Sequence, residues 1–128
     1  MRDELPRPTN AELEILTVLW SIGPSTVRGV YDVIRRRRPT QYSTILKFMQ
    51  IMAEKGLVRR DESERAHVYS AARAREWTQR QLASDLLERA FSGSAKALLI
   101  GALSSRKSTK KELAELRELL DQFQEPRK

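Results

Sequence analysis

The stretch from Thr40 to Tyr69 decides the fold of this chain, and it reads TQYSTILKFMQIMAEKGLVRRDESERAHVY. Apolar residues recur there at steps of three and four, which predicts one buried face on a helix over residues 41–55. That face carries Ile45, Phe48, Met49 and Met52. Gly56 can adopt the left-handed conformation that ends a helix, and two β-prone runs follow it. We expect these runs, Leu57–Arg60 and Ala66–Tyr69, to form a hairpin around a charged tip, Asp61–Arg65.

The opposite face of the predicted helix is rich in polar side chains. It carries Gln41, Tyr42, Ser43, Leu46, Lys47 and Gln50. Side chains of this kind hydrogen-bond to base edges and phosphates, and a leucine can touch a thymine methyl. A helix followed by a hairpin also suits the major groove of DNA. We therefore expect a DNA-reading surface; the alternative is an amphipathic helix and hairpin in some other small α+β domain.

The excess of positive charge is concentrated around this helix. The 128-residue chain has a formal net charge of +7, and the segment from Arg28 to Arg60 holds nine basic residues against two acidic ones. The rest of the chain is therefore neutral overall, so the whole excess falls where a polyanion would bind. Arg28 opens this segment and is a candidate for DNA binding. Cations near a helix C-terminus also favour the helix dipole, but the run Arg35–Arg38 exceeds that need, and we expect at least one of the four to contact phosphate.

Composition excludes several other classes of protein. The chain has no Cys, which rules out thiolate metal sites, a Cys nucleophile and disulfides. Met1–Pro8 lacks the apolar segment of a signal peptide, and the longest apolar run, Ala97–Leu103, is too short to cross a bilayer. We expect a cytoplasmic protein without membrane insertion and without a cofactor.

Two further helices are predicted before the reading helix. Thr9 and Glu12 have the spacing of a capping box, and the helix that they open should end at Gly23-Pro24. Its apolar stripe comprises Leu13, Leu16 and Trp20, with Ile15 and Leu19 beside it. A second helix should begin near Ser25 or Thr26, bury Val27, Val30, Tyr31 and Ile34, and end at Pro39. Three helices followed by a hairpin are the order of a winged helix-turn-helix, which we assign to residues 1–72.

Residues 73–128 have a different, helix-favouring composition. We expect helices near 73–91, 95–103 and 109–123, with breaks at Ser92-Gly93 and Ser104-Ser105. The chain is thus predicted to be mostly α, with a small β-hairpin wing and a C-terminal three-helix dimerisation region. Three such helices cannot easily close a core alone, so we expect a two-fold related copy to cover them; packing back onto the winged helix is the alternative. The candidate dimerisation residues are Leu86, Leu87, Phe91, Leu98, Leu99, Leu103, Leu113, Leu116, Leu120 and Phe123.

The chain resembles the BlaI/MecI penicillinase repressors, a family that includes the CopY-type copper repressors. The resemblance rests on the order and spacing of several short segments. They are residues 11–16 (AELEIL), Leu19-Trp20, Val27 to Tyr31, residues 42–45 (YSTI), residues 54–58 (EKGLV), residues 65–69 (RAHVY) and residues 112–116 (ELAEL). The resemblance implies a homodimeric repressor that binds inverted repeats in double-stranded operator DNA.

The family's functional positions can be carried onto this sequence. The base-facing positions fall on Tyr42, Ser43, Thr44, Leu46 and Lys47, and wing contacts fall near Arg65 and His67. Penicillinase repressors are basic where this chain has Ser43 and Leu46, so their operator sequence does not transfer. In those relatives a sensor-protease pathway cleaves an Asn-Phe bond, which aligns here with Gly101-Ala102, so induction by the same cleavage is in doubt. The Cys-rich tail of the copper repressors is absent, which excludes that route of copper sensing.

Other functions are weaker interpretations of the sequence. Ser104 with Lys107, and Ser108 with Lys111, match the S-x-x-K spacing of acyl-transfer enzymes but have no companion motif, so we do not expect an enzyme. His67 has no His or Cys companions for a metal. The remaining alternative is a basic helical adaptor that binds an acidic protein without sequence-specific DNA binding. A titration against random duplex DNA at two salt concentrations distinguishes the two.

Overall fold

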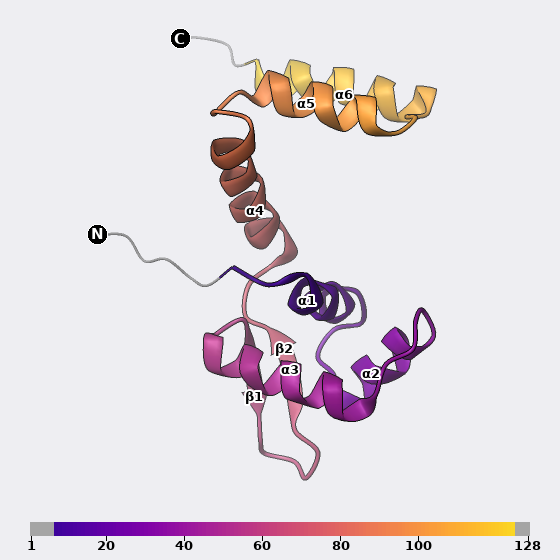
Figure 1. The fold of residues 1–128 in the computed structure, drawn as a ribbon, viewed down its shortest axis with the longest axis vertical. Helices are drawn as coiled ribbons and strands as arrows, with labels where there is room; N and C mark the ends of the chain where they lie inside the picture. The colour runs from indigo at the N-terminus through magenta and orange to yellow at the C-terminus, as the bar shows by residue number, and fades with distance from the viewer. Residues whose placement is uncertain (1–6, 125–128) are drawn as a thin grey trace, which may run out of the picture. The chain divides into compact units, whose positions relative to one another are not determined.

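The computed structural model describes residues 7–124, so most of the N-terminal stretch discussed above lies outside it. These described residues form six helices and one antiparallel hairpin (Figure 1). The elements are α1 (Asn10–Ile22), α2 (Val27–Arg35), α3 (Tyr42–Lys55), β1 (Val58–Asp61), β2 (Val68–Ala71), α4 (Arg75–Ala90), α5 (Ala95–Ser105) and α6 (Lys110–Phe123). Two compact units divide between Leu82 and Ala83. The functional boundary that we place after Ala72 stays a prediction.

The helices of the first unit begin where the capping signals predict, and α1 and α3 end at the predicted glycines. Thr9 and Glu12 form the reciprocal capping box: the Thr9 N–H donates to Glu12 Oε1 (2.9 Å), and the Glu12 N–H donates to Thr9 Oγ1 (3.2 Å). Thr26 caps α2 through a bond from the Gly29 N–H (3.1 Å). Gly56 ends α3 with φ +83°, the left-handed conformation that a side chain disfavours. Each cap satisfies backbone groups that a helix end leaves without partners.

One apolar core holds the first unit together, and all three helices and both strands contribute to it. Its buried members are Ile15, Leu16, Val18, Leu19, Val27, Val30, Ile34, Ile45, Met49, Met52, Val58 and Tyr69. The periodicity of α3 correctly predicted that Ile45, Met49 and Met52 are buried. Phe48 and Tyr31 are only partly buried, at the margin of the core. The core fixes one face of α3 against α1, α2 and the hairpin. The opposite face of α3 points to solvent.

The hairpin lies later in the sequence than predicted. Its register pairs Val58 with Ala71 and Asp61 with Val68, so the loop is residues 62–67 rather than Asp61–Arg65. The turn starts late because Asp61 Oδ1 accepts a bond from the Ser63 N–H (2.9 Å), which leaves Asp61 in the strand. The loop extends away from the three helices (Figure 1).

An isolated antiparallel β-bridge joins strand β2 of the hairpin to the link between α1 and α2. Ser25 and Tyr69 exchange two backbone bonds, with the Ser25 N–H donating to Tyr69 O (2.9 Å) and the Tyr69 N–H donating to Ser25 O (2.7 Å). Ser25 is therefore a bridge residue, and of the two predicted starts of α2 only Thr26 is the cap. The bridge fixes the root of the hairpin beside the start of the helix-turn-helix.

The second unit consists of the second half of α4 with α5 and α6. The predicted break at Ser92-Gly93 is confirmed, with φ +50° and +79° at these two residues. The break predicted at Ser104-Ser105 is wrong: both residues belong to α5, where the Ser105 hydroxyl donates to Ala102 O (2.9 Å) and so satisfies a backbone acceptor near the helix end. Thr109 caps α6. Within residues 7–124, no helix is both long and apolar enough to cross a membrane.

Candidate nucleic-acid interface

The outward face of α3 is rich in exposed polar side chains. Six of the predicted contact residues are exposed there: Gln41, Tyr42, Ser43, Thr44, Lys47 and Gln50. They occupy the N-terminal two-thirds of the helix, and Lys47 is the one cation among them. Gln41 is the N-cap residue, but its side chain makes no cap bond. This face therefore offers hydroxyl, amide and ammonium groups to a ligand at the end of α3 that lies nearest α2.

Leu46 behaves differently from the rest of the predicted reading face. It is partly buried and packs against the core, so only part of its side chain is available to a ligand. The reason is geometric: Leu46 follows the fully buried Ile45, and a helix step of 100° leaves it at the edge of the apolar stripe. A contact from Leu46 to a thymine methyl stays a prediction.

An aromatic and cationic cluster lies where α2 meets the first turn of α3. The rings of Tyr31 and Tyr42 pack edge to face, with centroids 5.7 Å apart and planes at 78°. Arg28 Cζ lies 5.7 Å from the Tyr31 centroid and 5.6 Å from the Tyr42 centroid. Arg35 Cζ lies 5.6 Å from the Tyr31 centroid. Arg28 thus lies beside the predicted reading face, although it belongs to a different helix.

The four consecutive arginines after Ile34 divide into two kinds. Arg35 pairs with Asp32 (3.3 Å), and Arg38 pairs with Glu14 of α1, with Nη2 2.6 Å from Oε1. The bonds that Arg38 donates to the Glu14 carboxylate, and then the charge of that carboxylate, raise the pKa of Arg38 above its ordinary value. Arg36 and Arg37 are exposed and make no ion pair within the described residues. Only Arg35 lies within α2, so this helix ends earlier than the predicted boundary at Pro39.

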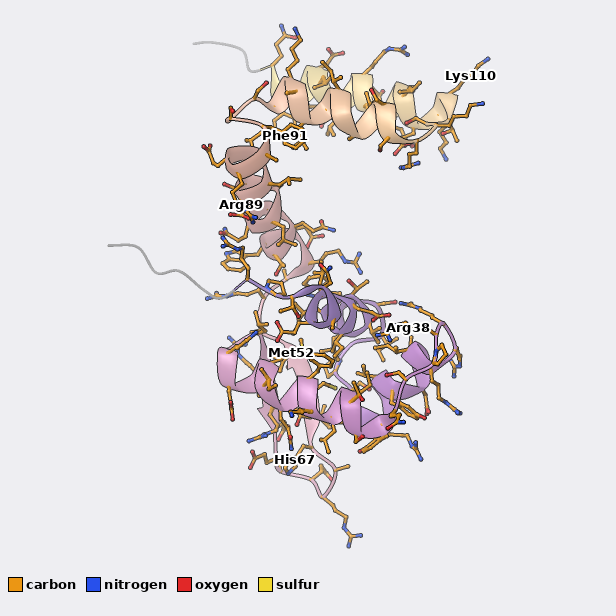
Figure 2. All side chains as sticks on the ribbon, in the orientation of Figure 1. Arg38, Met52, His67, Arg89, Phe91 and Lys110 are labelled. Atoms are coloured by element: carbon orange, nitrogen blue, oxygen red, sulfur yellow. The ribbon has the colours of Figure 1, made fainter. Side chains whose placement is uncertain are left out.

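Arg65 and His67 are both exposed on the hairpin loop, where Figure 2 labels His67. Arg60 on β1 is occupied: a bond with the Tyr69 side chain, and then the charge of Glu62, raise the pKa of Arg60 above its ordinary value. Its neighbour Arg59 is exposed on the strand. Among the described residues, no group of three or more His, Asp or Glu side chains is placed to hold a metal. The loop therefore presents the Arg65 guanidinium and the His67 imidazole to a ligand.

The far end of α3 is tied to α1 by an ion pair that the sequence did not suggest. Lys55 Nζ lies 2.8 Å from Oε2 of Glu12, and the side chain of Glu12 is 3% exposed. Burial alone would raise the pKa of Glu12, but the bonds from Lys55 and Thr9 outweigh it and lower that pKa below its ordinary value. The sequence predicted a capping role for Glu12, but it contained no local signal that Glu12 meets Lys55, which lies 43 residues later.

The candidate dimerisation residues are all at least partly accessible in the single chain. Leu86, Leu103, Leu120 and Phe123 are exposed, and Leu87, Phe91, Leu98, Leu99, Leu113 and Leu116 are partly buried. No residue from 83 to 124 is buried. Gly101 and Ala102 both lie within α5 and are exposed.

A family model for the penicillinase repressor matches residues 8–122 of this chain. The chain belongs to the penicillinase repressor family. The resemblance drawn from the short sequence segments is thereby confirmed, and the match includes both the helix-turn-helix and the helices that follow the hairpin.

Individual members of the penicillinase repressor family are similar over most of the chain. "Transcriptional regulator BlaI" of Mycobacterium tuberculosis (strain ATCC 25618 / H37Rv) is 34% identical over 99 residues, which are 76% of this chain and 72% of that protein. "Penicillinase repressor" of Staphylococcus aureus is 21% identical over 111 residues, 87% of this chain and 88% of that protein.

One solved structure has the same fold. The solution structure of the DNA binding domain of the repressor BlaI aligns with a TM-score of 0.51 at 20% identity. The alignment covers 58% of this chain and 90% of that domain. The predicted winged-helix fold of the N-terminal part is confirmed.

Proposed function

We propose that this protein represses transcription by binding double-stranded operator DNA as a homodimer. The single observation that carries the proposal is the exposed polar face of α3, in a family of repressors and on a winged-helix fold. The nine basic residues between Arg28 and Arg60 supply the positive field that such a surface needs. A cytoplasmic location follows from this role, because the DNA lies there.

The proposed contacts follow from the place of each side chain. Residues 41–44, Lys47 and Gln50 face the major groove, where Lys47 reaches a guanine or a phosphate and the amides reach adenine edges. Leu46 contributes from the margin of this face. Arg28 contacts the flanking backbone, and Arg65 and His67 contact it from the hairpin loop. Phosphate contacts fix the register of the protein, and base contacts supply the sequence preference.

Pairing of two chains is proposed through residues 73–128. The support is that apolar side chains at helical spacing remain accessible: Leu120 and Phe123 are 56% and 75% exposed. None of residues 83–124 is buried, so the apolar surface of this part of the chain is available to another chain. A second copy is the occupant that we propose, because two-fold pairing also doubles the reading helices and matches an inverted repeat.

Release by a sensor-protease pathway would need a cleavable bond, and the aligned pair Gly101-Ala102 is exposed but helical. A protease binds extended backbone, so α5 would first have to unfold locally. We propose that release does not depend on the Asn-Phe specificity of the relatives.

The test is a footprint across the DNA upstream of the protein's own gene, together with anisotropy titrations at two salt concentrations. We expect a protected inverted repeat and a steep fall of affinity with salt. Lys47→Ala and Tyr42→Ala should lower affinity for that repeat while gel filtration and circular dichroism stay unchanged. An adaptor for an acidic protein would show no protected repeat and little binding to duplex DNA at moderate salt.

A further inference from the structure

We infer that Tyr31 is a positioning residue for DNA binding, and that it holds Arg28 and Tyr42 in one preformed cluster before DNA arrives. The inference deepens the proposed function and rests on it for its consequence, but the cluster itself exists in the free protein.

The first step is the geometry of the cluster. The Tyr31 ring contacts two guanidinium groups, those of Arg28 at 5.7 Å and Arg35 at 5.6 Å, and it packs edge to face on Tyr42 at 5.7 Å. Both distances to guanidinium groups lie within the range of cation–π attraction. Arg28 also lies 5.6 Å from the Tyr42 ring, so two rings from two helices hold one cation.

The second step is the difference between the two cations. Arg35 has a carboxylate partner in Asp32, at 3.3 Å. Arg28 is exposed, and within residues 7–124 its interactions are with the two rings alone. A ring attracts the guanidinium without neutralising it, so the full charge of Arg28 remains for a phosphate. Arg35 instead serves to hold the Tyr31 ring.

The third step is that the N-terminus of α3 has no side-chain cap. Gln41 forms no side-chain cap bond, so the first turn of α3 depends on packing for its position. Tyr31 is partly buried against the core and contacts the first residue of α3 through the ring pair. Because a long cationic side chain otherwise loses conformational freedom on binding, fixing Arg28 beforehand reduces the entropic cost of the complex.

The test uses the full-length protein and a labelled short duplex of random sequence, since a phosphate contact does not need the operator. We expect Tyr31→Leu, which keeps apolar bulk, to weaken binding about three- to tenfold, and Tyr31→Phe, which keeps the ring, to stay within about twofold. Arg28→Ala should lower the salt slope by about one. In the Arg28→Ala background, Tyr31→Leu should lose most of its effect, because the residue acts through Arg28.

A second measurement separates this inference from the proposed function. In NMR spectra of the free protein, side-chain protons of Arg28 should be shifted upfield by the rings, and the shift should disappear in Tyr31→Leu but persist in Tyr31→Phe. Unshifted Arg28 protons would overturn the inference. Additive effects of Tyr31→Leu and Arg28→Ala on the binding free energy would overturn it as well. A wild-type protein that binds no duplex at low salt, with shifted Arg28 protons, would overturn the proposed function and leave the cluster intact as a structural feature.

Discussion

Lys55 and Glu12 join the end of the reading helix to the start of the first helix. Lys55 Nζ lies 3.0 Å from Oε1 and 2.8 Å from Oε2 of Glu12, and the same carboxylate accepts the backbone N–H of Thr9. One carboxylate therefore closes the capping box of α1 and fixes the C-terminal end of α3. The orientation of α3 on the core depends on this pair as well as on apolar packing.

Lys55→Met should destabilise the first unit by about 1.5–3 kcal/mol, because it leaves a buried carboxylate without its cation. Urea unfolding followed by circular dichroism measures the loss. The matched control is Arg89→Gln, which removes an exposed pair with Asp85 and should cost about 0.3–0.5 kcal/mol. Equal effects of the two substitutions would contradict the role given to Glu12.

Acid should destabilise the protein through Glu12. Its folded-state pKa is lower than its ordinary value of 4.5, so its ion pair contributes stability that is fully present above that value. This contribution is lost as the pH falls through the folded-state pKa. Urea midpoints measured from neutral pH to below pH 4.5 should therefore fall less steeply in Glu12→Gln than in the wild type. Parallel pH profiles would show that other carboxylates govern the acid response.

The two free arginines after α2 should affect DNA binding, and the paired one should affect stability. Arg36→Ala and Arg37→Ala should each lower the slope of log affinity against log salt by up to about one, with unchanged unfolding midpoints. Arg38→Ala breaks the pair with Glu14 and should shift the unfolding midpoint instead. An unchanged salt slope in the Arg36→Ala/Arg37→Ala double variant would mean that neither residue contacts phosphate.

Two glycines should respond to alanine with opposite signs. Gly56→Ala places a side chain at φ +83° and should destabilise the protein by about 1–2 kcal/mol, although nothing lies within 4 Å of the new Cβ. Gly101→Ala lies within a helix, and its Cβ would be 3.6 Å from the Phe91 ring, an ordinary contact. That change should stabilise α5 by about 0.5–1 kcal/mol. Thermal melting of both variants checks the contrast.

Leu116→Asp should separate the proposed dimer and weaken operator binding, because the linked second half-site is lost. Sedimentation at low micromolar concentration measures the subunit state. Ala114→Asp is the control, since it introduces the same charge on the same helix but points away from the Leu113, Leu116 and Leu120 stripe. A Leu116→Asp variant that remained dimeric would place the subunit contact on another helix.

Periodicity and capping signals were sufficient to predict the order of the helices and most of the buried face of α3, but not the ends of α2 and α5. These signals are local: Thr9 with Glu12, Thr26, and Gly56 each act within one turn. The two strands were predicted one and two residues too early, because the register of the hairpin depends on the Asp61 turn and on a bridge to Ser25, which lies 44 residues before Tyr69.

The candidate interface was predictable to a similar degree. Exposed polar residues on one face of α3 follow from its helical period, and the charge run marks the neighbouring surface. The cluster of Arg28, Tyr31 and Tyr42 was not predicted as a unit, because its members come from two helices and meet only through the crossing of α2 and α3. The sequence predicts that Tyr31 is buried in the core. In the structure Tyr31 is only partly buried, and its ring also contacts Arg28 and Arg35.

The bridge between Ser25 and Tyr69 uses main-chain atoms alone, and this has a consequence for how the sequence can change. Any small amino acid that supplies an N–H and a carbonyl at position 25 retains both bonds, because Ser25 packs closely against Gly29. Proline is the exception, since it has no N–H to donate. The attachment of the hairpin to the helix-turn-helix is therefore tolerant of mutation at this point, and a proline there would loosen the hairpin while leaving every apolar contact of the core in place.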